Sequence, residues 1–360
     1  MSKFISTRLA SLEAYVPGEQ PQDKKYIKLN TNESPFPPSA SVISAAKEEA
    51  GRLQLYSDPS LRELRYELAA LHGVAPENVI ATNGSDEVLD FSFLAFSDAE
   101  HPIVFPDITY GFYSVFADLY GIPYERIPLD SDFRVRAEDY IGISKNIVIA
   151  NPNAPTGLAL SLADIELIVA SNPDNIVIID EAYVDFGGES AVALTKKYKN
   201  LIVTGTFSKS RSLAGARLGF GIADAELISD LDKIRCSHNP YNVNRMTAAA
   251  GCAALRDNAY YMQNCKTVIE NREYTKRELR ERGFFVTDSL GNFLFAESKD
   301  ISGDELYLGL RERGILVRHL SGERIKNFNR ISIGTREDMD KFLSAVDEIL
   351  KEKKYEMCKN

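Results

Sequence analysis

A lysine directly follows an apolar segment near the middle of the chain. Lys209 ends the run Thr206–Lys209 (TFSK), after the segment LIVTG, and Arg217 lies eight residues further on. A lysine amine at the exit of a buried strand can form an imine with a carbonyl compound, and neighbouring hydroxyls and an arginine suit a phosphate. The pattern predicts a site for a phosphorylated carbonyl cofactor. The alternative is a solvated lysine at a strand end, which is the commoner environment of lysine. Choosing between these two interpretations needs support from other segments of the chain.

A second candidate group is the carboxylate of Asp180. It follows four apolar residues, 176–179, a pattern typical of a strand buried on both faces of a parallel sheet. Ligands bind at the carboxyl ends of strands in open α/β sheets, so we expect Asp180 to face a ligand crevice. A buried carboxylate needs a cationic partner. A protonated pyridine nitrogen would be such a partner.

A proline-rich turn precedes both groups in the chain and directly follows a strand-like run. The segment Asn151–Gly157 (NPNAPTG) follows the strand-like run NIVIA. Its two prolines and its glycine predict a turn at the same sheet edge as Asp180 and Lys209. Ser161, with Asp164 three positions later, predicts a capped helix start. Taken alone, an ordinary strand-to-helix loop explains this segment better.

A third segment is a candidate for binding a phosphate. Gly84, Ser85 and Asp86 precede the helical run 87–96 (EVLDFSFLAF). Backbone N–H groups and the positive end of the helix dipole make a helix start an anion site. The negative charge of Asp86 opposes a phosphate, and capping the helix is its alternative role.

Together these segments resemble the fold-type I enzymes that use pyridoxal 5′-phosphate, and within them the class I and II aminotransferases. Inside that family the pattern is similar to the histidinol-phosphate aminotransferases. The resemblance extends over nearly the whole chain. It includes, in order, AYVPGE, KLNTNESPFPPS, ATNGSDEVLDF, PDITYGFY, NPNAPTG, VIIDEAYVDFG, TFSKSRSLAGARLGFG, GILVRHL and RISIGTRED.

The resemblance implies a role for each residue around the cofactor. Lys209 would carry it as an imine and then move a proton between the substrate α-carbon and the cofactor. Asp180 would pair with the pyridinium nitrogen, Tyr183 would hydrogen-bond the phenolate oxygen, and Tyr110 would stack on the ring. The implied phosphate contacts are Gly84, Ser85, Asp86, Thr206, Ser208 and Arg217.

One position departs from the family pattern. Members usually carry an asparagine immediately before Pro-Thr-Gly in this loop, where it donates to the phenolate oxygen, and here that position is Ala154. Asn153, one residue earlier, is the candidate to replace it. Without Asn153, Tyr183 would make that contact alone.

The resemblance also implies two substrate pairs, glutamate with 2-oxoglutarate and histidinol phosphate with imidazole-acetol phosphate. Both pairs carry an anion away from the amino group, and family arginines bind it. The tyrosine that matches Tyr56 enters from a neighbouring subunit in the family, which implies a homodimer. The alternative for the arginines is an exposed strand face. The implied substrate residues are Tyr15, Asn32, Tyr56, Asn292, Arg318 and Arg330.

Composition excludes several classes of function. The net charge of −10 argues against a nucleic-acid partner, because phosphate backbones need a basic surface. No apolar stretch approaches the roughly 20 residues of a membrane-spanning helix, and the first residues lack the apolar core of a signal peptide. We therefore expect a cytosolic protein without membrane contact. The four histidines are scattered and the four cysteines, Cys236, Cys252, Cys265 and Cys358, show no C-x-x-C spacing, so no metal site is expected.

The order of the predicted elements indicates an α/β fold. We expect an N-terminal arm at residues 1–29, a large domain at 30–250 with a mainly parallel, doubly wound sheet, and a smaller α+β domain at 251–360. A helical segment from about Asn242 to Arg282 would join the two domains. The strands expected in the large domain are VIAT, HPIVFP, NIVIAN, NIVIID, NLIVTGTF and RLGFGIA.

Other functions remain as alternatives. A phosphate-loop NTPase would need a glycine directly before Lys209, where Ser208 stands, and a dinucleotide site would need a glycine in place of Asp224. A non-catalytic protein on the same fold would normally carry an additional interaction segment. Closer alternatives with the same lysine are an aromatic amino acid aminotransferase and a threonine-phosphate decarboxylase.

Overall fold

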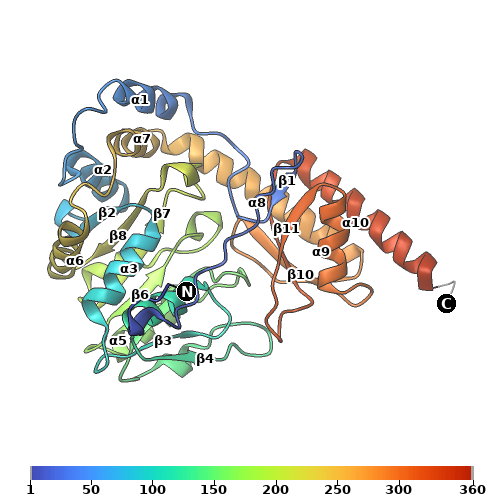
Figure 1. Cartoon of the computed structure of the whole chain (residues 1–360), viewed down its shortest axis with the longest axis horizontal. Coiled ribbons are helices and arrows are strands. Elements are labelled where there is room, and N and C mark those ends of the chain that lie inside the picture. The colour runs from blue at the N-terminus through green and yellow to red at the C-terminus, as the bar shows by residue number, and fades with distance from the viewer. Residues whose placement is uncertain (1, 358–360) are drawn as a thin grey trace.

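The protein has two lobes, each built around its own sheet, in a computed structural model that describes residues 2–357 (Figure 1). The large lobe contains a seven-stranded sheet and the small lobe a five-stranded sheet. The long helix α8 (Asn258–Glu281) runs from one lobe to the other (Figure 1). Cys252 and Cys265 are buried and Cys236 is exposed, all as free thiols, whereas Cys358 lies outside the described residues.

The seven-stranded sheet is mainly parallel, as the sequence predicts. Only β8 runs antiparallel to its neighbours, β2 and β7. The edge strand β4 is absent from the sequence prediction, because its run YERI is only half-buried and has no apolar pattern. In sheet order the strands are β2 (Val79–Thr82), β8 (Gly219–Ala223), β7 (Leu201–Thr206), β6 (Val177–Asp180), β5 (Asn146–Ala150), β3 (Ile103–Pro106) and β4 (Tyr124–Ile127).

Helices cover both faces of this sheet, so both faces must be apolar. Alternate side chains of β5 pack on opposite faces of the sheet: Ile147 and Ile149 belong to one core cluster, and Val148 belongs to the other. One face packs against α3 (Ser85–Phe96), α4 (Phe112–Tyr120) and α6 (Ala225–His238), and the other against α2 (Arg62–His72), α5 (Leu162–Ser171) and α7 (Arg245–Arg256), with α1 (Ala40–Ala50) packed on α7.

The local start of α5 follows the predicted pattern. The Ser161 side chain accepts from the backbone N–H of Asp164, and the Asp164 carboxylate accepts from that of Ser161, which is a complete capping box. These two bonds satisfy donors that the first helical turn leaves free. The turn 151–157 therefore passes directly into a helix with a fixed start.

The small lobe takes strands from both ends of the chain. β1 (Ile27–Leu29) pairs in parallel with β11 (Ile315–His319), so the end of the expected arm is part of this sheet. The expected boundary between residues 250 and 251 falls inside α7. The rest of the lobe comprises β12 (Asn329–Ser332), β10 (Phe293–Ser298), β9 (Phe284–Val286), α9 (Gly303–Glu312) and α10 (Arg336–Met357).

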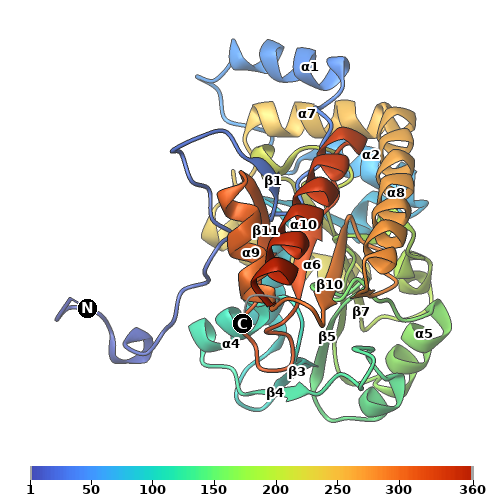
Figure 2. The ribbon, with the colours of Figure 1, turned by 90° about the vertical axis from the view of Figure 1, so that its right-hand side faces the viewer.

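The apolar stripe of the last helix is core packing, as expected from its helical spacing. Figure 2 shows α10 lying across the small lobe, and the segment before β1 extending past α4. No helix of residues 2–357 is both long enough and apolar enough to span a bilayer. The stripe residues, Met339, Phe342, Leu343, Val346 and Ile349, are all buried in the small-lobe cluster.

A glycine in β8 provides a test of how tightly the sheet holds the start of α3. A Cβ at Gly219 would lie 2.1 Å from the backbone nitrogen of Ser85 and 2.3 Å from the carbonyl carbon of Gly84. We expect Gly219→Ala to lower the free energy of unfolding in urea by about 2 kcal/mol, because backbone must move. Gly215→Ala is the matched control, since its Cβ would meet no atom within 4 Å. Equal stability of the two variants would contradict this packing.

Candidate active site

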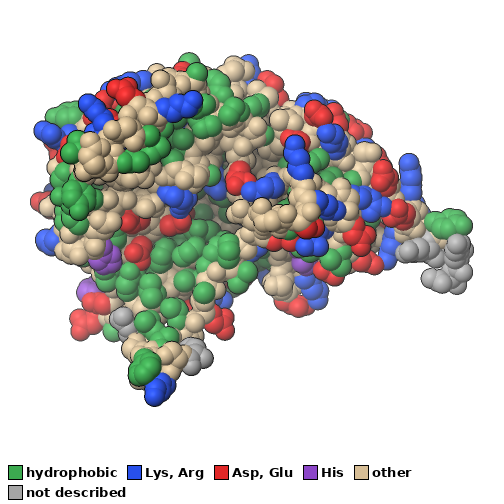
Figure 3. Space-filling view, turned by 45° about the horizontal axis from the view of Figure 1, so that its top comes forward, with side chains coloured by type: hydrophobic (Ala, Val, Ile, Leu, Met, Phe, Trp, Pro, Cys, Tyr) green, Lys and Arg blue, Asp and Glu red, His purple; other side chains and the backbone are tan. Residues whose placement is uncertain are grey.

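A cavity of about 190 Å³ lies at the carboxyl ends of β6 and β7, and we call it the inner cavity. Lys209 and Asp180 both line it, so the structure brings the two predicted groups to one space. It adjoins a larger cavity of about 710 Å³ between the lobes, the outer cavity. The surface is hollowed where the lobes meet (Figure 3). The residues common to both cavities are Thr31, Asp86, Tyr110, Ala154, Tyr183, Lys209 and Arg217.

Asp180 is a buried carboxylate that pairs with no cationic side chain of residues 2–357. Its oxygens accept from Tyr113 Oη at 2.9 Å and from Thr204 Oγ1 at 3.1 Å. Burial raises the pKa of Asp180 to about 6 in spite of these donors, because the charged form is poorly solvated. A cation bound in the inner cavity would favour the ionised form.

The adjacent carboxylate, Glu181, faces away from this site. Successive side chains of an extended segment point to opposite faces, and Glu181 accepts from Ser190 Oγ and from the backbone N–H of Ala191, each at 2.6 Å. Burial raises the pKa of Glu181 to about 8. Because Glu181 lines neither the inner nor the outer cavity, Asp180 is the member of the pair that can serve a ligand.

Lys209 lies beside two tyrosines that the sequence assigns to the cofactor. Its Nζ donates to the carbonyl of Thr31 at 3.3 Å and lies 5.8 Å from the ring centroid of Tyr183. Tyr183 Oη accepts from Asn32 Nδ2 at 3.0 Å. Tyr110 Oη donates to Asp86 at 2.9 Å. Both tyrosines and the lysine therefore face the space where the two cavities join.

The start of α3 and Arg217 together form a cradle for an anion. Gly84 is the N-cap of α3 with φ +83°, a conformation that glycine adopts readily. A Cβ there would lie 2.6 Å from Nη2 of Arg217, so the glycine lets the guanidinium approach the helix start. Arg217 also donates to Ser208 Oγ at 3.5 Å. The hydroxyl residues Ser85, Thr206 and Ser208 line the same cavity.

Asp86 does not cap α3, and that alternative is wrong. The helix has Gly84 as its N-cap and no side-chain cap. The Asp86 carboxylate instead accepts from Tyr110 Oη and pairs with Arg217 Nη2 at 3.2 Å. It therefore holds the aromatic side chain and the guanidinium in place together.

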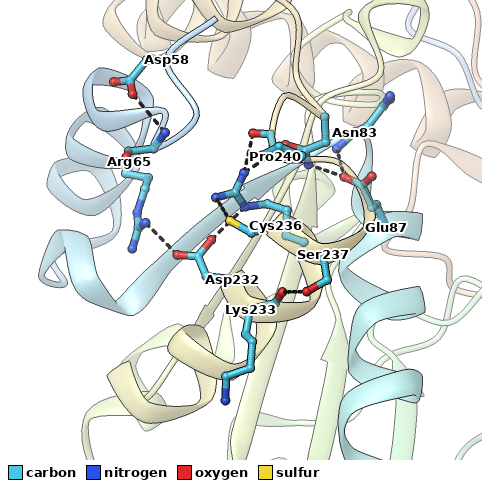
Figure 4. Close-up of polar contacts among 12 residues, drawn as sticks. Asp58, Arg65, Asn83, Glu87, Asp232, Lys233, Cys236, Ser237 and Pro240 are labelled. Atoms are coloured by element: carbon cyan, nitrogen blue, oxygen red, sulfur yellow. Dashed lines mark hydrogen bonds and ion pairs between the residues drawn. The ribbon is translucent and has the colours of Figure 1, made fainter.

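A partly buried polar network ties this cradle to α6 (Figure 4). Glu87, in the first turn of α3, accepts from the backbone N–H of Asn83 at 2.7 Å and from Asn242. Arg235 donates to Asn242 at 3.4 Å, to the Pro240 carbonyl at 3.1 Å and to Asp232 at 2.8 Å. The turn before α3 is thus fixed by α6 and the loop that follows it.

The structure does not bring Asn153 to the site. Its amide donates to the Ile108 carbonyl at 3.0 Å and to Thr156 Oγ1 at 3.1 Å, and its oxygen accepts from Thr109 Oγ1 at 2.8 Å. These bonds hold the loop and leave Asn153 outside both cavities, whereas Ala154 lines both. No side-chain amide of residues 151–157 lines either cavity.

Two arginines of the small lobe and one arm tyrosine line the outer cavity. Arg330 donates to the Asn30 carbonyl at 2.9 Å, but its Nε is buried without a partner. No carboxylate of the described residues lies within 4 Å of it, and burial lowers its pKa. Arg318 donates to the carbonyls of Val16 and Pro17 at 3.0 and 3.2 Å. Tyr15 stacks on Phe112.

Three predicted substrate residues lie elsewhere. Asn32 and Asn292 are buried behind Tyr183 and line neither cavity, and Asn292 Nδ2 donates to the Asn32 carbonyl at 2.9 Å. Tyr56 is 77% exposed on the large lobe, where it stacks on Tyr241 at 4.4 Å between ring centroids. Within one chain, therefore, Tyr56 does not reach the cavities.

Sequence reasoning missed the donors to Asp180 and a link across the outer cavity. Tyr113 lies one helical turn after Tyr110, a spacing that would have suggested a common face. Thr204 is the register partner of Asp180 in the sheet, which no local pattern reveals. Arg324 of the small lobe pairs with Asp107 of the large lobe at 3.2 Å, and long-range pairs of this kind leave no signal in spacing.

Residues 24–346 match the family model for aminotransferase class I and II. The chain belongs to this family. A histidinol-phosphate aminotransferase of Brachyspira hyodysenteriae is 49% identical over 353 residues, 98% of this chain and 100% of that protein. One of Clostridium acetobutylicum is 46% identical over 351 residues, 97% and 100% of the two chains. The structure of histidinol-phosphate aminotransferase from Sinorhizobium meliloti in complex with pyridoxal-5′-phosphate matches with a TM-score of 0.87 at 24% identity, covering 98% of this chain and 99% of that one. This last likeness shows the fold.

Class I and II aminotransferases use pyridoxal 5′-phosphate, and the chain is a transaminase dependent on this cofactor. The inner cavity fits it on chemical grounds. It offers an amine in Lys209, a buried carboxylate without a cation in Asp180, and an anion cradle at Arg217 that a Cβ at position 84 would fill. Each charged part of the cofactor has a group of opposite charge.

The pKa of Asp180 predicts how cofactor affinity depends on pH. Only the ionised carboxylate can pair with a protonated ring nitrogen, so binding of pyridoxal 5′-phosphate to the cofactor-free protein should strengthen as the pH rises through about 6. Titrating that protein with the cofactor between about pH 5 and pH 8 measures the effect.

Asp180→Asn is the control, since an amide does not titrate. It should remove this pH step and lower kcat by about 100-fold, because the ring nitrogen loses its buried ionic partner. The stability of the cofactor-free wild-type protein should change with pH in the opposite direction to its affinity for the cofactor. Because the pKa of Asp180 is about 6 in the folded protein and 3.8 ordinarily, the free energy of unfolding should fall as the pH rises between these two values. A pH step that persists in the Asn variant would contradict the assignment.

Proposed function

We propose that this aminotransferase transfers the amino group of histidinol phosphate to 2-oxoglutarate. The observation that carries the proposal is the near-complete match, at 49% and 46% identity, to two relatives that are histidinol-phosphate aminotransferases. The outer cavity supports it, because Arg330 lines this cavity and pairs with no carboxylate of the described residues. Such a group favours substrates with an anion remote from the reacting amine.

The side chains around the inner cavity divide the chemistry among them. Bound pyridoxal 5′-phosphate supplies a carbonyl for amines and a ring that accepts electrons. Lys209 Nζ would anchor the cofactor and then carry the proton between the substrate α-carbon and the cofactor. Asp180 would keep the ring nitrogen protonated, and Tyr110 would lie against the ring. Ser85, Thr206, Ser208 and Arg217 would hold the phosphate at the start of α3.

The outer cavity would hold the remote anion of each substrate in turn. Arg330 would bind it through its guanidinium, because the side chain lines the cavity and pairs with no carboxylate of the described residues. Arg318 lines the cavity and also holds the arm, because it donates to the backbone carbonyls of Val16 and Pro17. Tyr15 would close the cavity on the arm side. The aromatic and charged lining suits an imidazole with a phosphate.

We also propose a homodimer in which Tyr56 reaches the outer cavity of the partner. Tyr56, Leu53 and Leu55 are exposed apolar side chains in one segment of the large lobe. Figure 3 shows hydrophobic side chains gathered over this lobe, and exposed apolar patches of this kind mark protein contacts. The arm, which extends past α4 (Figure 2), would contact the same partner. We place this dimer in the cytosol.

Half-reactions with single substrates test the substrate assignment. The pyridoxal form of the protein should react with histidinol phosphate and with glutamate at much higher kcat/KM than with phenylalanine. Threonine phosphate should release no carbon dioxide. Preference for phenylalanine would instead make the protein an aromatic aminotransferase, and carbon dioxide release would make it a decarboxylase.

Replacing Arg330 tests whether one arginine serves both substrates. Arg330→Gln should raise the KM for glutamate and for histidinol phosphate by about 10- to 100-fold each, because each loses a charged hydrogen bond. Stopped-flow half-reactions measure the two effects separately. Loss of affinity for only one substrate would mean that the two anions bind at different places.

Mixed dimers test the cross-subunit role of Tyr56. Lys209→Ala and Tyr56→Ala dimers should each be nearly inactive. A mixed dimer contains one site with an intact Lys209 and an intact Tyr56 from the partner, so mixing the two variants should restore activity. Activity that stays at the level of the parent variants, although mixed dimers are isolated by affinity tags, would exclude the shared site.

A further inference from the structure

The hydrogen bonds around Tyr183 orient its hydroxyl group. Ala154 offers no donor to the inner cavity and Asn153 faces away from it. Of the two residues that the family resemblance makes candidates to donate to the cofactor's ring oxygen, Asn153 and Tyr183, only Tyr183 lines the inner cavity. A phenol has a single proton, so it can donate there only if another group does not take that proton.

The chain of bonds begins at a backbone group whose role is fixed. The N–H of Asn32 donates to Ser332 Oγ at 2.8 Å. Ser332 Oγ, an acceptor in that bond, donates its own proton to Asn32 Oδ1 at 2.8 Å. With the amide oxygen of Asn32 facing Ser332, the Ser332 hydroxyl proton has an acceptor, and the described residues offer it no other. Because oxygen and nitrogen of an amide lie on opposite sides, Nδ2 faces Tyr183 and donates to Oη at 3.0 Å.

The Tyr183 hydroxyl therefore accepts a hydrogen bond from Asn32, and its own proton remains available to donate to a ligand. Asn32 is the residue of the described chain that hydrogen-bonds Tyr183 Oη. The other charged or titratable groups that face Tyr183 are Lys209, with Nζ at 5.8 Å from the ring centroid, Arg330, and the tyrosines Tyr15, Tyr110 and Tyr113. Asn32 itself is 1% exposed, so water does not compete for its amide.

The backbone of Asn32 also favours asparagine at this position. Its φ is +54°, in the left-handed region, which asparagine and aspartate enter more easily than most other residues. The Asn292 side chain donates to the Asn32 carbonyl at 2.9 Å and holds this conformation. The residue therefore combines a strained backbone with a side chain that is fixed at both ends, a combination found at functional sites.

We propose that Asn32 is a positioning residue that directs the hydroxyl proton of Tyr183 into the inner cavity, with Ser332 fixing its orientation. Asn32 thus supports the cofactor from behind Tyr183, not as a residue in contact with substrate. This inference rests on the proposed cofactor contact of Tyr183. A donor at the ring oxygen weakens that oxygen's hold on the proton it shares with the bound amine, and so lowers the pH midpoint of the visible absorbance.

The test is the pH midpoint of the visible absorbance of the protein loaded with pyridoxal 5′-phosphate. Asn32→Asp keeps shape and backbone preference but replaces the donor by an acceptor, which takes the Tyr183 proton. It should raise the midpoint by about one pH unit. In a Tyr183→Phe background the same change should have little further effect, because the two residues act as one unit. A full shift in that background would overturn the proposal.

Two further variants keep the test decisive. Ser332→Ala frees the Asn32 amide to rotate and should raise the midpoint by less than Asn32→Asp does. If Asn32→Asp does not fold, Ser332→Ala provides the test in its place. Asn329→Asp makes the same substitution in β12, the strand that contains Ser332, where the amide donates to the Gly303 carbonyl instead. It should leave the midpoint unchanged. An equal shift in Asn329→Asp would overturn the proposal. A wild-type protein without titrating visible absorbance would overturn the cofactor contact as well, whereas a normal wild-type titration with unmoved variants would overturn this inference alone.

Discussion

The site depends on one buried carboxylate that lines the inner cavity and pairs with no cation in the described part of the chain. Asp180 ends β6, at the sheet edge where the apolar strands stop, and the donors Tyr113 and Thr204 do not offset the loss of water around it. A hydrogen bond from a neutral donor stabilises a charge less than an opposite charge does. The structure is thus prepared for a cation at this one point. The neighbouring Glu181 is also buried and bonded to neutral donors, but it lines neither cavity and is therefore not available to a ligand there.

The remaining parts of the cleft are arranged around that point by long-range contacts. The start of α3 and Arg217 meet because β8 brings a glycine against the helix start. Asp86 then joins Arg217 to Tyr110, and Glu87 joins the same turn to α6. From the other lobe, Arg330 faces the outer cavity and Arg324 spans to Asp107. Each group is placed by residues distant in the chain, so the lobes must be assembled before the cleft exists.

The sequence predicts the strands and the anchor residues because their signals are local. Apolar runs ending in a carboxylate or followed by a lysine identify β6 and β7, and the serine with an acid three residues later identifies the start of α5. β4 and β1 escape prediction since they are short and only partly buried. The direction of the Asn153 side chain and the donors to Asp180 depend on loop hydrogen bonds and on strand register. Such contacts arise only when segments far apart in the chain meet.

The pairing of β1 with β11 has a consequence for how the protein is made. Ile27 lies beside Ile315 in the sheet, so a segment among the first to leave the ribosome must wait for nearly the whole chain before it finds its partner. Pairings this distant in sequence form late, because closing a long loop costs entropy before any contact compensates for it. The large lobe, whose strands all lie between these two segments, can fold during synthesis. Tyr15 and the arm therefore reach the cleft last, and the outer cavity gains its small-lobe wall only when the C-terminal part of the chain is complete.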